Sequence, residues 1–278
     1  MRHRLIWLVM AVAAVVPAFG GTISVNLGSA SSFALLGSTI TDTGISHITG
    51  NVGATTTITI NDPWVVTGTV YPAGDPTATA AYSAFETAYN TTLALGNTQP
   101  TLTSLPLTQT FTGNNVYTFT NAISTTTTTA LTFDAQNISS EVFVIQIEGA
   151  FTVNGELSFN LINGAQFNNI FWIVEDAATI SVGSSLPQTF DGSILAGTSF
   201  TMSAASRPGG SGVLAGTING CVFSETANTL AGQTTVNGCV GGGLPGGGPA
   251  TPEPGSAELM SLGCLLGIVA WRKFRVSF

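Results

Sequence analysis

Three features of the sequence predict a β-dominated fold of stacked coils, a β-solenoid, with one long α-helix packed alongside it. Residues 141–223 carry one β-type pattern four times, residues 55–71 alternate threonine with apolar residues, and residues 75–97 show a helical period. Repeats of this length are too short to bury an apolar face alone. They therefore stack on their neighbours and share one core.

Each of the four copies combines an apolar β-type run, a corner of small residues and a second, alternating run. The copies are Val142–Gly155 (VFVIQIEGAFTVNG), Ile170–Gly183 (IFWIVEDAATISVG), Ser193–Met202 (SILAGTSFTM) and Gly212–Phe223 (GVLAGTINGCVF). The second copy follows the first at an offset of 28 residues, and the letters LAGT at Leu195–Thr198 recur 19 residues later at Leu214–Thr217. We expect each copy to form one coil of the stack.

The region before the repeats supplies further strands and the helix. Thr55–Ile60 alternates Thr and Ile, which is typical of a half-buried strand, and Trp64–Tyr71 continues that habit. Asp75 and Pro76 are a capping residue and a first-turn proline, and they open a helix over residues 76–95 or so. Its stripe of Ala, Tyr and Phe is expected to cover the open flank of the solenoid.

Both ends of the chain carry targeting features. Residues 1–20 combine a basic start, an apolar run and small residues, as a secretory signal peptide does. Residues 241–256 form a Gly/Pro linker, and residues 257–278 form an apolar helix with a basic end, leaving the mature domain at 21–240. The apolar run is shorter than the roughly 20 residues of a full membrane span. The basic residues after it are expected to keep the end of the tail on the cytoplasmic side of the membrane.

The C-terminal segment resembles the PEP-CTERM sorting tail of Gram-negative bacteria. The resemblance rests on Pro252, Glu253 and Pro254, the apolar helix, and the basic residues Arg272, Lys273 and Arg275. It implies export, transient anchoring in the inner membrane, recognition by an exosortase, and a secreted or cell-surface mature protein.

The charges of the mature chain exclude several partners. Residues 21–250 contain twelve acidic residues and one basic residue, Arg207. Such a negative chain is a poor partner for nucleic acid or anionic membrane surfaces. It is also sparsely charged, so its surface is expected to consist mainly of Thr, Ser, Asn and Gly.

Few residues could carry catalysis, a metal or a cofactor, and none of the three is expected. His47 is the only histidine outside the signal peptide, which leaves no catalytic triad and no metal-ligand spacing. Glu175 and Asp176 are adjacent, so in a strand they point to opposite faces. Cys221 and Cys239 are the only cysteines of the mature domain, and they are either a disulfide formed after export or two unpaired small residues.

The mature domain as a whole resembles the microbial ice-binding proteins, from about Val25 to Val236. The passages that carry the resemblance are Leu27–Phe33 (LGSASSF), Ile48–Gly53 (ITGNVG), Leu161–Trp172 (LINGAQFNNIFW) and Leu214–Gly216 (LAG), in that order around the single helix. This family implies a right-handed β-solenoid that binds ice through one flat face.

The family resemblance also implies where ice would be bound. Its members use T-A/G-x-T/N-like stretches at the coil corners, and short polar residues at matching or neighbouring corners extend the set. The candidates in this chain are Thr43, Ser46, Thr129, Thr132, Ser158, Ser184, Ser206, Thr226 and Thr229.

Two functions remain open on the sequence alone. The first is ice binding, as in antifreeze proteins and inhibitors of ice recrystallisation, with the ice crystal surface as the partner. The second is a structural or adhesive role in the extracellular matrix, with exopolysaccharide as the partner. Sorting tails of this type are associated with such biofilm matrices.

Overall fold

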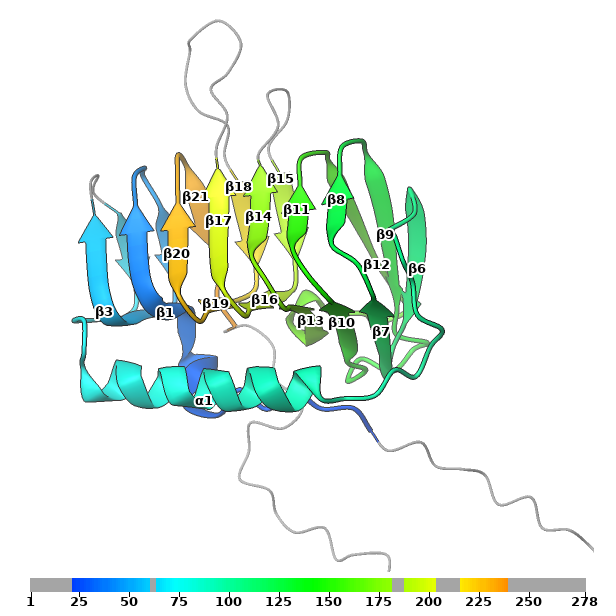
Figure 1. Ribbon diagram of the computed structural model, residues 1–278, viewed down its shortest axis with the longest axis horizontal. Coiled ribbons are helices and arrows are strands. Elements are labelled where there is room, and N and C mark those ends of the chain that lie inside the picture. Colours follow the sequence, from blue (N-terminus) through cyan, green and yellow to red (C-terminus); the bar gives the residue numbers. More distant parts are fainter. Residues whose placement is uncertain (1–21, 61–63, 182–187, 204–215, 240–278) are drawn as a thin grey trace, which may run out of the picture.

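The computed structural model describes residues 22–60, 64–181, 188–203 and 216–239 of the 278-residue chain. These residues form a solenoid of parallel strands with one α-helix along its side, as the sequence predicts (Figure 1). The expected signal peptide, linker and C-terminal sorting segment lie outside the described residues. No helix in the described part of the chain is long and apolar enough to cross a membrane.

The solenoid has three faces, and the first of them, which we call the helix face, lies against the helix. Its order along the stack runs from β5 through β3 and β1 to β7. Its strands are β5 (Val70–Tyr71), the first halves of β3 (Asn51–Ile60) and β1 (Phe33–Asp42), β19 (Val222–Ser224), β16 (Ser193–Ala196), β13 (Ile170–Val174), β10 (Phe143–Ile147) and β7 (Asn115–Phe119). Because both sides of β10 and β13 are covered, these strands are continuous apolar runs rather than alternating ones.

The second face, which we call the threonine face, is exposed to solvent. It consists of the second halves of β3 and β1, then β20 (Ala227–Leu230), β17 (Ser199–Ser203), β14 (Ala178–Ser181), β11 (Phe151–Val153) and β8 (Ile123–Thr125). Neighbouring strands pair in parallel along the whole face, which Figure 1 shows toward the viewer.

The third face, which we call the split face, consists of two separate sheets. One contains β6 (Thr108–Thr112), β9 (Thr129–Asp134) and β12 (Leu157–Ile162). The other contains β15 (Gln188–Asp191), β18 (Gly216–Asn219), β21 (Thr234–Val236), β2 (His47–Thr49) and β4 (Val65–Thr67). The two sheets adjoin at β12 and β15.

The coils follow the predicted repeats only in part. The first two copies pair with each other, but Ile145 lies beside Trp172, so the observed offset is one residue shorter than the predicted 28. The third copy forms β16 and β17. The fourth copy was assigned wrongly. Its LAGT letters end in β18 on the split face, whereas the first LAGT belongs to β16 on the helix face, and β16 pairs with β19. Identical letters thus occupy different faces of the coil.

The order of the coils in space differs from their order in the chain. β1 pairs with β19 and β20 of the C-terminal coil on one side and with β3 on the other. The N-terminal coils therefore extend the stack beyond the C-terminal one. The helix carries the chain from β5, at this end of the stack, to β6 and β7 at the opposite end (Figure 1).

The helix α1 (Pro76–Leu93) has nearly the predicted bounds. The Asp75 side chain caps it by accepting a hydrogen bond from the Thr77 amide at 2.7 Å. Its buried face includes Ala81, Phe85 and Tyr89, and the ring centroid of Phe85 lies 5.6 Å from that of Phe223 on the helix face. The aromatic stripe thus covers the flank of the solenoid, as expected.

The interior of the solenoid is filled by stacked aromatic rings. Trp172 lies parallel to Phe151 at 5.3 Å between centroids, and Phe133 stacks on Phe111 at 4.9 Å. Trp172, Phe151, Phe133 and Phe111 are all fully buried. Trp172 also contacts the rings of Phe133 on β9 and Phe190 on β15, so the rings pack the interior continuously.

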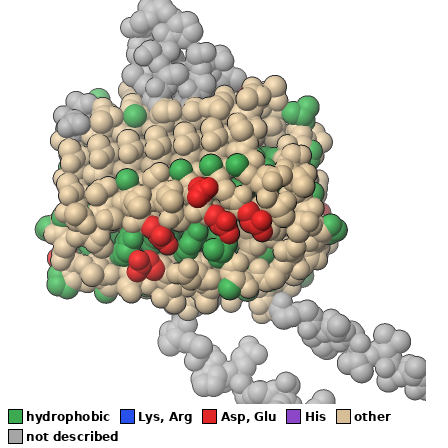
Figure 2. Space-filling view, in the orientation of Figure 1, with side chains coloured by type: hydrophobic (Ala, Val, Ile, Leu, Met, Phe, Trp, Pro, Cys, Tyr) green, Lys and Arg blue, Asp and Glu red, His purple; other side chains and the backbone are tan. Residues whose placement is uncertain are grey.

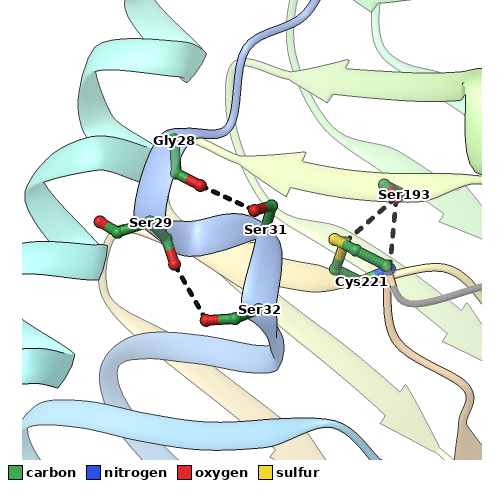
Figure 3. The surroundings of a disulfide bond; sticks show 7 residues. Gly28, Ser29, Ser31, Ser32, Ser193 and Cys221 are labelled. Atoms are coloured by element: carbon green, nitrogen blue, oxygen red, sulfur yellow. Dashed lines mark hydrogen bonds between the residues drawn. A yellow bond between two sulfur atoms is a disulfide. The ribbon is translucent and has the colours of Figure 1, made fainter. Parts of the chain in front are cut away.

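A disulfide joins Cys221 to Cys239, the last described residue. Ser193 Oγ lies 3.3 Å from both the Cys221 amide nitrogen and its sulfur, so the bond sits against the neighbouring coil (Figure 3). The short 3₁₀ helix η1 (Gly28–Ser32), with its internal serine hydrogen bonds, passes beside it. The disulfide thereby ties the end of the described chain to the coil that contains β19.

Candidate functional site

A straight row of hydroxyl side chains runs along the middle of the threonine face. Strand pairing places one such residue of each coil directly beside that of the next. In spatial order they are Thr59, Thr41, Thr229, Thr201, Thr179, Thr152 and Ser124. Because paired strands lie about 4.8 Å apart, the row repeats at that interval across seven coils. We call these seven residues the threonine row.

Each member of the row lies between two side chains that point inward. Thr41 stands between Ile40 and Asp42, and Thr201 stands between Phe200 and Met202, all four of which are fully buried. Packing on both sides fixes the backbone of each strand. Threonine is in addition stiff at χ1, so its methyl and hydroxyl groups keep fixed positions.

The hydroxyl groups of the row are available to an external partner. Within the described residues, no hydrogen bond engages the side-chain hydroxyl of Thr41, Thr152, Thr179, Thr201 or Thr229. By contrast, the polar side chains of a neighbouring row bind each other. Ser203 Oγ lies 3.3 Å from Ser181 Oγ, which donates to Asn154 Oδ1 at 3.1 Å.

A third row, on the helix side of the threonine row, is also small and neutral. Thr57, Thr39, Ala227 and Ser199 follow one another there by strand pairing. The two rows therefore present small hydroxyl and methyl groups side by side. Figure 2 shows the threonine face as regular lines of neutral side chains without acidic atoms among them.

Acidic side chains border this face on the side toward the helix (Figure 2). Glu148, Glu175, Asp176 and Glu225 lie in the turns that join the helix face to the threonine face. Burial, and secondarily the nearby Glu86 charge, raises the pKa of Glu225. The described part of the chain contains no Lys or Arg to neutralise them. The carboxylates thus mark an edge where the neutral surface ends.

The sequence-predicted contact residues fall in several places. Thr229 lies in the threonine row, Thr43 directly follows β1 at the border of the same face, and Thr226 is exposed at its corner. Thr132 and Ser158 lie on the split face. Ser184 and Ser206 lie outside the described residues.

Two of the predicted residues are in the interior, where they cannot contact ice. Thr129 is 2% exposed, and Ser46 is fully buried with its hydroxyl donating to Asp42 Oδ1 at 2.9 Å. The physical reason for Thr129 is strand alternation, because residues three apart in a strand point to opposite sides. Thr132 is consequently the outward residue of that pair.

Five threonines of the row were missed by reasoning from corner motifs: Thr41, Thr59, Thr152, Thr179 and Thr201. The signal that locates them is a threonine with a core residue on each side, as in Phe151-Thr152-Val153 and Phe200-Thr201-Met202. That pattern describes the middle of a strand rather than a corner. The threonine row therefore lies on the strands themselves.

No group of three or more His, Cys, Asp or Glu side chains capable of holding a metal occurs among the described residues. The threonine face is one continuous sheet, and the hollow lined in part by Ser158 and Thr189 lies on the split face. The threonine face can therefore recognise an extended, regular surface.

Comparisons with known proteins agree with this geometry. A family model described as Ice-binding-like matches residues 34–239. An ice-binding protein of Flavobacterium frigoris (strain PS1) is 30% identical over 224 residues, covering 74% of each chain. An ice-binding protein of Nostoc sp. (strain HG1) is 35% identical over 179 residues, and the chain spans 63% of that relative's length.

Solved structures give the same result. The ice-binding protein of the Antarctic ascomycete Antarctomyces psychrotrophicus superimposes with a TM-score of 0.64 at 30% identity, over 77% of this chain and 98% of that one. An ice-binding protein from an Antarctic biological consortium gives a TM-score of 0.63 at 28% identity, over 79% and 94% of the two chains. The stacked coils, the flanking helix and the matched span all agree: the chain belongs to the Ice-binding-like family.

Proposed function

We propose that this protein binds ice through the threonine face, without catalysis and without a cofactor. The observation that carries the proposal is the threonine row, seven hydroxyl residues at strand spacing on one unbroken sheet. The names of the related proteins in the comparisons point to the same ligand.

The physical basis is a surface that needs no rearrangement before it meets ice. Stiff side chains on a packed strand lose little conformational freedom on binding, so little of the contact energy is spent on ordering. Each row position offers a methyl group and an uncommitted hydroxyl group. The lack of charge within the face leaves the adjoining water free to take a lattice-like arrangement.

The split face is a poorer candidate for the same role. Three of its polar side chains are engaged with one another, since Asn237 Nδ2 donates to Asn219 Oδ1 and Asn219 Nδ2 donates to Asp191 Oδ1, both at 2.7 Å. It also carries the carboxylate of Asp191 and a gap between two sheets. Neither regularity nor neutrality extends along its length.

Substitution at the centre of the row tests the proposal. Thr201→Tyr adds a bulky ring to the middle of the face and should remove most thermal hysteresis and inhibition of ice recrystallisation, while circular dichroism stays unchanged. Thr217→Tyr is the matched control, because Thr217 is the outward residue of β18 on the split face, and it should keep full activity. Loss of activity only in the control would reject the threonine face, and no activity in the unmodified protein would reject ice binding.

Export and sorting are a separate part of the proposal. The signal peptide of residues 1–20 and the PEP-CTERM-like tail support secretion, transient inner-membrane anchoring and processing by an exosortase in a Gram-negative bacterium. Mass spectrometry of the protein from a host with that enzyme should show both ends removed. Retention of residues 252–275 in the mature protein would contradict processing at the tail.

A matrix function is the second candidate, and it is favoured by the same tail. In that case the mature protein would remain with extracellular polysaccharide and would show no effect on ice growth at high concentration. The ice assays above separate the two functions.

A further inference from the structure

A hollow opens on the split face where β12 and β15 lie side by side in separate sheets. No backbone pairing joins them among the described residues, although adjacent strands pair within each of the two sheets. The hollow has a volume of about 250 Å³ and is lined by Glu156, Leu157, Ser158, Phe159, Thr189 and Asp191.

Side chains hold this gap open and satisfy the strands beside it. The Gln188 side-chain amide donates to the Leu157 carbonyl at 3.2 Å and accepts from the Leu157 amide at 3.4 Å. The Trp172 indole donates to the Asp191 carbonyl at 3.1 Å. Buried backbone groups require such partners, so the gap is a built feature of the fold rather than a frayed edge.

The lining combines apolar and polar surface. Leu157 and Phe159 supply the apolar part, and the ring of Phe159 is fixed against Phe190 at 5.2 Å between centroids. The hydroxyls of Ser158 and Thr189 and the carboxylates of Glu156 and Asp191 supply the polar part.

Asp191 is the best-positioned polar group of the hollow. Its Oδ1 accepts from Asn219, whereas its Oδ2 has no hydrogen-bond partner among the described residues. Burial raises the pKa of this carboxyl, and the Asn219 hydrogen bond opposes that rise. A hydroxyl donor placed in the hollow would therefore offset part of the cost of burying the carboxylate.

Size and charge restrict the ligand. A volume of 250 Å³ is far more than the roughly 30 Å³ of one water molecule, and it lies below the ~300–1,000 Å³ of sites for drug-sized ligands. Two carboxylates, with no Lys or Arg in the described chain, disfavour an anion. A small neutral molecule with several hydroxyl donors and one apolar edge fits this size, and its hydroxyls can donate to the two carboxylates.

We propose that this hollow binds one ring of a saccharide, with its C–H groups against Phe159 and its hydroxyls on Asp191 and Glu156. The site lies on a different face from the threonine row, so it does not depend on ice binding. A sugar held there would leave the threonine face free.

Saturation-transfer difference NMR of the full chain with the methyl glycosides of glucose, galactose, mannose and N-acetylglucosamine tests the proposal. At least one glycoside should show transfer to its ring protons. Asp191→Asn should weaken that binding about tenfold, which is the loss expected for one charge-assisted hydrogen bond. Thr189→Trp, at an exposed position, should fill the hollow and abolish binding without disturbing the core.

The control is Glu148→Gln, which removes an exposed carboxylate at the border of the threonine face and should leave glycoside binding unchanged. Circular dichroism and thermal melting establish that each variant is folded, and Thr189→Trp should retain any ice activity of the parent. Absence of transfer from all four glycosides, or full binding in folded Thr189→Trp, overturns the proposal.

Discussion

At the scale of single residues, position 197 links the edge of the threonine face to the helix. Neighbouring coils carry Glu175 and Glu225 at the equivalent corner, but this coil carries Gly197, whose amide donates to the Val174 carbonyl at 2.8 Å. A Cβ atom here would collide with the Tyr89 hydroxyl and the Glu175 carbonyl. Burial raises the pKa of Tyr89 to about 12, so its hydroxyl stays a donor, and it lies 3.4 Å from the Val174 carbonyl.

Gly197→Ala should therefore lower the free energy of unfolding by about 1–3 kcal/mol, because Tyr89 and the helix must shift to admit the methyl group. Urea denaturation measures the change. Gly96→Ala is the control, since a Cβ at Gly96 meets no atom within 4 Å, and its effect should stay within about 0.5 kcal/mol. If Gly197→Ala and Gly96→Ala changed the free energy of unfolding equally, the position of Tyr89 would not require a glycine at residue 197.

Residue spacing also explains why the sequence located only part of the candidate site. Thr229 could be found because its motif runs from a corner into a strand, so that its last residue points outward. Thr129 and Thr132 match the same motif, but both lie inside one strand. Because they are three residues apart, their side chains point to opposite sides, and that of Thr129 points inward. A motif alone does not tell which of the two contexts applies.

At the scale of elements, the helix is held at its C-terminal end by one buried amide. Gln146, on β10, donates to the carbonyls of Thr92, Leu93 and Leu95 at 2.8, 3.2 and 3.1 Å. Its Oε1 accepts from the Thr118 hydroxyl at 2.8 Å. Helix C-termini leave carbonyl groups without partners in the helix itself, and this side chain satisfies them.

Gln146→Leu keeps a similar volume but removes the amide donor of these buried carbonyls, whereas the Thr118 hydroxyl keeps Asn97 Oδ1 as its acceptor at 2.9 Å. We expect a loss of about 1–3 kcal/mol in the free energy of unfolding, measured by chemical denaturation. Asn90→Ala serves as the control, because Asn90 is exposed and its amide bonds only the Glu86 carbonyl. A Gln146→Leu protein as stable as the parent would mean that water replaces the amide without cost.

The elements themselves were largely predictable. The helix was expected over about residues 76–95 and spans Pro76–Leu93, since the Asp-Pro opening and the apolar stripe are local signals. The apolar runs of β10 and β13 were recognised for the same reason. Which repeats occupy equivalent positions was not predictable, because the same residues can occur on different faces of a coil, as in β16 and β18.

At the scale of the whole molecule, acidic side chains dominate the charge of the described residues. The described residues carry eleven acidic side chains and no Lys or Arg. Burial raises the pKa of Glu141, Asp191 and Glu225. A carboxyl with a raised pKa in the folded state contributes stability below its unfolded pKa, and that contribution is lost as the pH rises through the folded value.

The thermal midpoint should accordingly rise as the pH is lowered from neutral toward the ordinary carboxyl pKa values of about 4, because these three carboxylates take up protons and repel their neighbours less. Differential scanning calorimetry across this range measures it. Glu225→Gln should flatten the dependence, because it removes one of the shifted groups and its repulsion with Glu86. A midpoint that declines steadily toward acid would show that other carboxylates, stabilised in their charged form, dominate.

The order of the coils could not be predicted, because it depends on contacts such as that of Thr41 with Thr229, which are nearly the whole domain apart in sequence.

The order of the coils decides how such a molecule can be lengthened during evolution. The C-terminal coil lies between β1 and β16, so a coil duplicated at the C-terminus would have no free sheet edge to pair with. Additional turns must be inserted in the middle of the gene. The 18-residue helix is about 27 Å long, close to the ~29 Å covered by seven strands, so each inserted turn requires about three more helical residues. A wider threonine face and a longer helix would have to be acquired together.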